Sequence, residues 1–69
     1  MTVVVVHMDL YETRTLFGVF ESRDKWLEEI KPHLERKGYK GPIVWNHIDI
    51  GLKTLTAEEV EMNEFQEYL

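Results

Sequence analysis

The alternation of side chains near the start of the chain constrains the fold more than any other feature. Residues 3–11 are rich in β-branched side chains, and a β-strand points successive side chains to opposite faces. One alternating set is wholly apolar: Val4, Val6, Met8 and Leu10. The other set begins apolar and ends polar: Val3, Val5, His7, Asp9 and Tyr11. We therefore expect a strand with one face on a hydrophobic core and the other half open to solvent.

A second strand is expected directly after the first. The polar residues 12–14 form a break, and Thr15–Glu21 then reads as a strand antiparallel to the first. Gly18 inside it suggests a β-bulge or a close approach of another group. With simple alternation, Leu16, Gly18 and Phe20 point to the helix described next, and Phe17 and Val19 to the opposite face.

A helix follows the second strand. Ser22 is a good N-cap, and Lys37 with Gly38 supplies a basic last turn and a C-cap. One helical stripe is apolar: Trp26, Leu27, Ile30 and Leu34. Pro32 interrupts this segment and removes a backbone hydrogen bond, so we expect a kink or a fresh helical turn there.

The second half of the chain predicts one further strand and an ambiguous end. Ile43–Ile50 alternates as a strand, with Ile43, Trp45, His47 and Asp49 on one face. For residues 54–69, a capping box at Thr56 and Glu59 favours a helix, which would cover the open sheet face. The alternation of Val60 and Met62 with glutamates favours an edge strand over about 54–62, and this is the interpretation we prefer.

These elements predict a small α+β fold with a single domain over residues 1–69. The sheet is antiparallel with three to four strands in ββαββ order, one helix packs on one face, and the acidic segment 54–69 is a candidate for loose order. A chain of 69 residues buries only about 60% of its unfolded surface, so pairing with itself or a partner would add stability.

Composition excludes several kinds of protein. The chain has no cysteine, which rules out disulfides and thiol chemistry. The net charge of −5 comes from residues 54–69, because residues 1–53 have equal numbers of acidic and basic side chains. This charge disfavours nucleic acid and anionic membranes as partners. The opening residues resemble neither a signal peptide nor a membrane span, so we expect a cytoplasmic protein.

Two copies of a His-x-Asp pattern are the candidates for a metal site. His7 with Asp9, and His47 with Asp49, would project from the same face if the first and third strands were neighbours in register. Two imidazoles and two carboxylates suit zinc or another transition ion. The alternative interpretation, which we prefer, is that they mark the polar ends of two strands. We expect no metal, no cofactor and no catalytic residues.

The sheet face away from the helix is the expected binding surface. An apolar patch rimmed by polar groups is typical of a protein interface, including a homodimer interface. A row of glutamates near the C-terminus would either bind a basic partner or keep the protein soluble. The predicted partner-binding residues are Val5, Tyr11, Phe17, Trp45, Glu58, Glu59, Glu61 and Glu64.

Three stretches give the chain a resemblance to known proteins: the opening "VVVVH", the "FGVFES" before the charged helix, and the acidic "EEVEMNEF". With these it resembles short uncharacterised ββαββ proteins of bacteriophages and Gram-positive bacteria. The resemblance implies a fold and a phage-like context, with no activity attached. The predicted function is a non-enzymatic accessory protein that binds and modulates a host protein. The alternatives are a small metal-binding or catalytic protein and a structural homodimer or assembly subunit.

Overall fold

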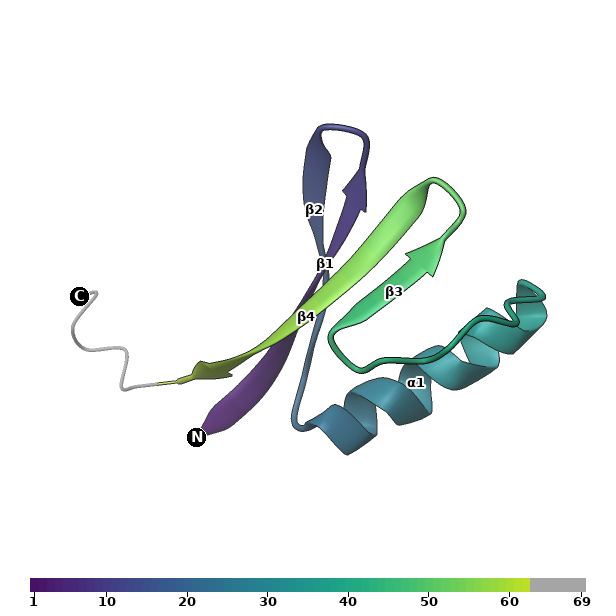
Figure 1. Ribbon diagram of the computed structural model, residues 1–69. Coiled ribbons are helices and arrows are strands. Elements are labelled where there is room, and N and C mark those ends of the chain that lie inside the picture. Colours follow the sequence, from purple (N-terminus) through teal and green to yellow (C-terminus); the bar gives the residue numbers. More distant parts are fainter. Residues whose placement is uncertain (63–69) are drawn as a thin grey trace.

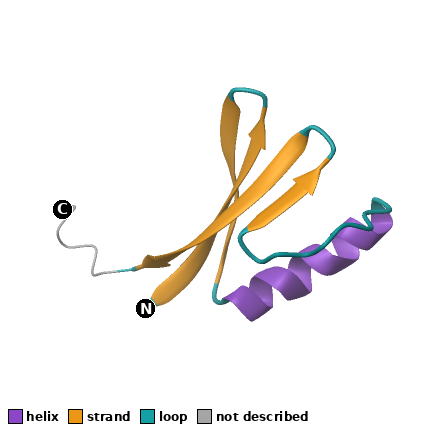
Figure 2. Ribbon diagram, in the orientation of Figure 1, coloured by secondary structure: helices purple, strands orange, loops and turns teal. Residues whose placement is uncertain are grey.

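The computed structural model describes residues 1–62 and shows a small α+β fold (Figure 1). Its elements are β1 (Thr2–Leu10), β2 (Thr13–Phe20), α1 (Arg23–Arg36), β3 (His47–Ile50) and β4 (Lys53–Glu61). The strands form one antiparallel sheet in the order β2-β1-β4-β3, and the helix lies to one side of it (Figure 2). The fold class is confirmed. The ambiguous segment is a strand from Lys53 to Glu61, and residues 63–69 lie outside the described part of the chain.

The hydrophobic core lies between α1 and the sheet. Its fully buried side chains come from the helix and three strands: Val4, Val6, Trp26, Ile30, Leu34, Ile48 and Leu55. The alternation predicted for the first strand is confirmed, because Val4 and Val6 are buried and Met8 packs against this cluster. The three buried helix residues belong to the predicted apolar stripe. The sheet face on this side of the molecule is called the helix side below.

The helix has the predicted caps. Ser22 Oγ accepts a 3.1 Å hydrogen bond from the Lys25 N–H. At the other end Gly38 has φ 74°, and the N–H of Tyr39 donates to the Leu34 carbonyl at 2.9 Å. This is a Schellman motif, which needs a left-handed residue at the position of Gly38. α1 continues through Pro32 as one helix, so no new helix begins there.

A β-bulge in β2 changes which side chains face the helix. Val6 pairs with Gly18 but His7 pairs with Leu16, so Phe17 is the extra residue. The ring of Phe17 lies edge-on to Trp26, with 6.1 Å between centroids, while Leu16 shares the face of His7. Gly18 correctly indicated a bulge. The expected faces of Leu16 and Phe17 were wrong, because one inserted residue reverses the alternation beyond it.

The third strand is shorter than predicted. β3 begins at His47, and residues 43–46 belong to the connection from the helix. The backbone carbonyl of Trp45 accepts a 2.7 Å hydrogen bond from Trp26 Nε1, and the Arg23 guanidinium lies 3.9 Å from the centroid of the Trp45 ring. Trp45 therefore packs on the helix side, and its expected place on the opposite face was wrong. A buried indole N–H needs an acceptor, and here the connection supplies it.

Candidate functional site

The sheet face turned away from α1 is the candidate functional site, and we call it the open face. Strand pairing assigns to it Val3, Val5, His7 and Asp9 of β1, Arg14, Leu16 and Val19 of β2, His47 and Asp49 of β3, and Thr54, Thr56, Glu58 and Val60 of β4. Side chains that face each other on neighbouring antiparallel strands share one side of the sheet. The open face has a polar half around Asp9 and Thr54 and an apolar half around Val5 and Val19.

Two cross-strand rows make up the polar half. The first row runs Arg14, Asp9, Thr54, Asp49 from β2 to β3. The second row runs Leu16, His7, Thr56, His47. The four residues of the His-x-Asp patterns thus share one face and are in matched register. The other condition for a shared site, that the two strands are neighbours, is not met, because β4 lies between β1 and β3.

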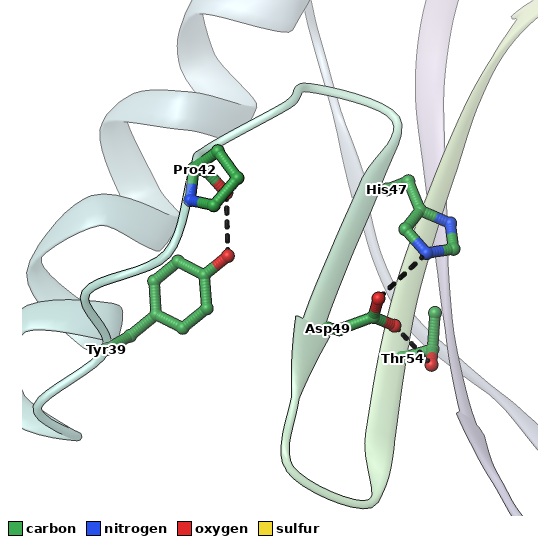
Figure 3. A network of polar contacts seen from close by, with 5 residues as sticks. All are labelled: Tyr39, Pro42, His47, Asp49 and Thr54. Atoms are coloured by element: carbon green, nitrogen blue, oxygen red, sulfur yellow. Dashed lines mark hydrogen bonds and ion pairs between the residues drawn. The ribbon is translucent and has the colours of Figure 1, made fainter.

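Hydrogen bonds join the outer residues of these rows at the β3 edge (Figure 3). Thr54 Oγ1 donates to Asp49 Oδ1 at 2.9 Å, and His47 Nε2 lies 3.3 Å from Asp49 Oδ2. The Thr54 hydroxyl is the main cause of a pKa for Asp49 below its ordinary value, and His47 adds to the effect. Figure 3 also shows the Tyr39 hydroxyl, which donates to the Pro42 carbonyl at 2.6 Å. Both residues belong to the connection between α1 and β3.

Arg14 joins the rows at their other end. Its Nε lies 3.4 Å from Asp9 Oδ1, and its Nη2 donates to Thr56 Oγ1 at 3.0 Å. The side chain therefore reaches from β2 across β1 to β4. His7 stands beside this contact with its Nδ1 buried, and within residues 1–62 that atom has no hydrogen-bond partner. The sequence prediction missed Arg14, which lay in the segment taken as a polar break.

This geometry does not assemble a metal site from the four candidate ligands. Neighbouring strands lie about 4.8 Å apart, so the β1 and β3 backbones are separated by about 10 Å. A zinc ion holds its nitrogen and oxygen ligands at about 2.0–2.2 Å. Among the described residues, no group of three or more His, Cys, Asp or Glu side chains could hold a metal ion. The residues that separate the two His-x-Asp copies are Thr54 and Thr56.

The His47–Asp49 pair also lacks the arrangement of a catalytic dyad with a nucleophile. Both side chains are exposed, at 57% and 67%. The neighbouring hydroxyl of Thr54 donates to Asp49 and not to His47. General-base activation of a hydroxyl needs the imidazole within hydrogen-bond reach of it. The described contacts join His47, Asp49 and Thr54 at the edge of the sheet.

The apolar half of the open face is carried by β1 and β2. Val19 lies opposite Val5, and Leu16 lies one row further along, beside His7. Leu16 is 61% exposed and Val19 55% exposed, while Val5 is half-buried. Val5 lies where it was predicted to lie. Leu16 was missed, although the bulge signalled by Gly18 could have revealed it.

The other predicted aromatic residues are elsewhere. Phe17 and Trp45 are on the helix side, as described above. Tyr11 is 79% exposed in the β1–β2 turn and has a positive φ of 57°. The open face is consequently aliphatic at its apolar end, and the aromatic surface expected from the sequence does not form.

The glutamates of β4 do not form one row. Glu58 is exposed on the open face opposite Val5, whereas Glu59 and Glu61 lie on the helix side of the sheet. Glu59 Oε1 lies 2.6 Å from Arg23 Nη2, and Glu61 contacts the terminal amino group at 3.0 Å and accepts from Thr2 Oγ1 at 2.7 Å. These Glu61 partners lower its pKa, with the Thr2 hydroxyl as the largest cause. Glu64 lies outside the described residues.

Comparison of the chain with protein-family models, with curated proteins and with solved structures finds no match. Across residues 1–62, the structure contains no helix that is long and apolar enough to cross a membrane.

Proposed function

We propose that this chain is a non-enzymatic protein-binding module that contacts its partner through the open face. One observation carries the proposal: Leu16 and Val19 are more than half exposed on the face turned away from the helix, with Val5 directly opposite Val19. Exposed aliphatic side chains gathered on one surface, rimmed by polar groups, are typical of protein interaction sites. The resemblance to short phage proteins favours a host protein as the partner, which the chain would modulate by binding.

The charges of the open face specify the kind of partner surface. Its apolar half is bordered by the carboxylate of Glu58, and its polar half contains Arg14 held by Asp9. The chain as a whole has a net charge of −5. A complementary surface would have aliphatic side chains at its centre and a basic group opposite Glu58. Nucleic acid fits poorly, because its binding depends on uncompensated lysine and arginine.

Affinity capture with matched variants tests the proposal. Tagged wild-type protein, a Leu16→Asp variant and a Leu52→Asp variant would be exposed to the same host lysate. Leu52 is the control because it is 70% exposed and lies in the β3–β4 turn, away from the open face. We expect one stoichiometric protein to be retained by wild type and by Leu52→Asp and lost with Leu16→Asp. Retention that is equal for all three would refute the open face as the binding surface.

The contribution of charge is tested separately by Glu58→Gln. If a basic group of the partner faces Glu58, this variant should bind more weakly, and the loss should shrink as salt is raised. Glu59→Gln is the matched control, because Glu59 is on the helix side and already paired with Arg23. Equal loss with both variants would point to net charge rather than to the open face.

A further inference from the structure

Among the described residues, the outer edge of β2 is a second surface that no other element covers. Within residues 1–62, β2 pairs with β1 on one side and has no strand on the other. Natural proteins usually protect such edges with proline, lysine, bulges or very short strands. β3, the opposite edge, is only four residues long. β2 is eight residues long, has no proline or lysine, and contains one bulge.

The bulge makes the pattern of side-chain directions along β2 symmetrical about the middle of the strand. Arg14, Leu16 and Val19 point to the open face, and Thr15, Phe17, Gly18 and Phe20 to the helix side. The point between Phe17 and Gly18 is the centre of this pattern. Residues at equal distances on either side of it, such as Leu16 and Val19, point to the same face. A regular strand, which alternates strictly, has its centre of symmetry on a residue and not between two residues.

We infer that β2 pairs antiparallel with β2 of a second copy of this chain, around a two-fold axis between Phe17 and Gly18. Leu16 then faces Val19 of the second copy, Thr15 faces Phe20, and Phe17 faces Gly18. In each pair the side chains present lie on the same side of the joined sheet. A shift of one residue in either direction fails, since Thr15 would face Val19, or Phe17 would face Val19, with the two side chains on opposite sides of the sheet.

The bulge also explains why the occupant is a second copy and not an arbitrary strand. A regular strand cannot keep its side chains on matching faces along the whole of β2, because the extra residue reverses the alternation halfway. A second β2 has the same reversal at the same place. The bulge therefore selects for self-pairing in one register, whereas most bulges at a sheet edge only discourage pairing.

Charge and exposure agree with this register. Leu16 and Val19 are 61% and 55% exposed, and the pairing brings them into two symmetrical aliphatic contacts. Arg14 would face Glu21, the residue that directly follows the strand. Each end of the junction would therefore have a pair of opposite charges. Arg14 remains accessible, with its side chain 57% exposed beside Asp9. The acidic strand β4 is separated from this edge by β1, which limits repulsion between the copies.

This self-pairing goes beyond the proposed function, because it uses the edge of the sheet and requires no other protein, although Leu16 and Val19 take part in both. It would join the two four-stranded sheets into one and bring the apolar halves of both open faces together. The test is accordingly made with the purified 69-residue chain alone, by sedimentation equilibrium over a range of concentrations. A mass of twice 8.3 kDa is expected for wild type. A monomer at every concentration up to about 1 mM would overturn the inference.

Two double variants that differ in one charge test the register. In Leu16→Glu/Val19→Glu, the two introduced carboxylates face each other across the junction, and the dimer should weaken by at least about tenfold. In Leu16→Lys/Val19→Glu, opposite charges face each other and dimerisation should be retained. The replaced side chains are exposed, and a circular dichroism melt confirms that each variant is folded. If the dimer weakens equally in both variants, the register is overturned. If Leu16→Glu/Val19→Glu dimerises as strongly as wild type, the interface is overturned.

Cysteine cross-linking provides an independent readout, because the chain has no cysteine of its own. Facing residues of antiparallel strands have Cβ atoms about 4.5–5.5 Å apart, close to the separation in a disulfide. Under mild oxidation, a mixture of the single variants Leu16→Cys and Val19→Cys should form mixed disulfide dimers. Each variant alone should cross-link much more slowly, since identical positions lie on opposite sides of the two-fold axis. Equally fast cross-linking of Leu16→Cys alone would contradict the pairing.

Discussion

The indole nitrogen of Trp26, in the middle of the core, donates a 2.7 Å hydrogen bond to the backbone carbonyl of Trp45. Trp26 is 1% exposed and packs against Phe17 and Phe20 as well. The contact ties the helix to the connection that leads into β3. It gives a buried polar group its hydrogen-bond partner two residues before β3 begins at His47.

Replacing Trp26 with phenylalanine should lower the free energy of unfolding by about 2–4 kcal/mol, through the lost hydrogen bond and the smaller ring. Chemical denaturation followed by circular dichroism measures this loss. Trp45→Phe is the matched control, because Trp45 contributes its backbone carbonyl and keeps an aromatic ring near Arg23. An equal loss in both variants would show that the hydrogen bond is not the important part of the contact.

Gly38→Ala should destabilise the protein by about 1 kcal/mol, because Gly38 has φ 74° and a Cβ atom is unfavourable there. No atom lies within 4 Å of the position where that Cβ would be, so the cost is one of backbone conformation alone. Thermal unfolding measures it. Lys37→Ala, at an ordinary helical φ of −87°, should have little effect.

Tyr11→Gly should raise the free energy of unfolding by about 1 kcal/mol. Tyr11 has φ 57° at the first position of the two-residue β1–β2 turn, a conformation that glycine adopts without strain. The side chain is 79% exposed, so little packing is lost. Glu12→Gly, at the neighbouring position without a positive φ, should not stabilise. A destabilised Tyr11→Gly variant would indicate that the tyrosine ring makes a contribution of its own.

Pro32→Ala should stabilise the helix by about 1–3 kcal/mol. Pro32 is exposed in the interior of α1 and cannot donate the backbone hydrogen bond that this position would otherwise make. Denaturant unfolding measures the gain. Lys31→Ala, at the preceding exposed position, should change stability only slightly. No gain for Pro32→Ala would mean that the local backbone does not relax when the ring is removed.

Thr54→Val should raise the pKa of Asp49 towards its ordinary value, because the Thr54 hydroxyl is the largest cause of its depression. A carboxyl group with a lowered pKa in the folded state stabilises the protein above its unfolded pKa, and this contribution is lost as the pH falls through the folded pKa. NMR titration of the Asp49 carboxyl follows the shift. Thr56→Val is the control, since Thr56 contacts Arg14 and not Asp49. Identical titration curves in wild type and Thr54→Val would refute the assignment.

Local patterns in the sequence were sufficient for the class of fold. The apolar alternation of Val4 and Val6, the stripe of Trp26, Ile30 and Leu34, and the caps at Ser22 and Gly38 all lie where the pattern placed them. These features act within a few residues, through strand alternation, helical periodicity and backbone conformation. The fourth strand was only preferred over a helix, because both patterns were present near Thr56.

The candidate site was predicted less well than the fold. The two His-x-Asp copies do share a face and a register, but the pairing of both β1 and β3 with β4 keeps them apart. Local alternation specifies faces within a strand and says nothing about which strands become neighbours. The glutamates of β4 are divided between two faces by that alternation itself, because Glu58 and Glu59 are adjacent in the strand.

By itself, the sequence determined that this chain forms an antiparallel sheet with one capped helix, because alternation, periodicity and caps depend on neighbours along the chain. Only the tertiary structure decided the order β2-β1-β4-β3, the helix-side positions of Phe17 and Trp45, and the exposure of Leu16. The order of the strands follows from the pairing of β4 with both β1 and β3, which are distant in the sequence. The residue inserted in β2 places Phe17 and Leu16, and the hydrogen bond of the buried Trp26 indole holds the connection at Trp45 on the helix side.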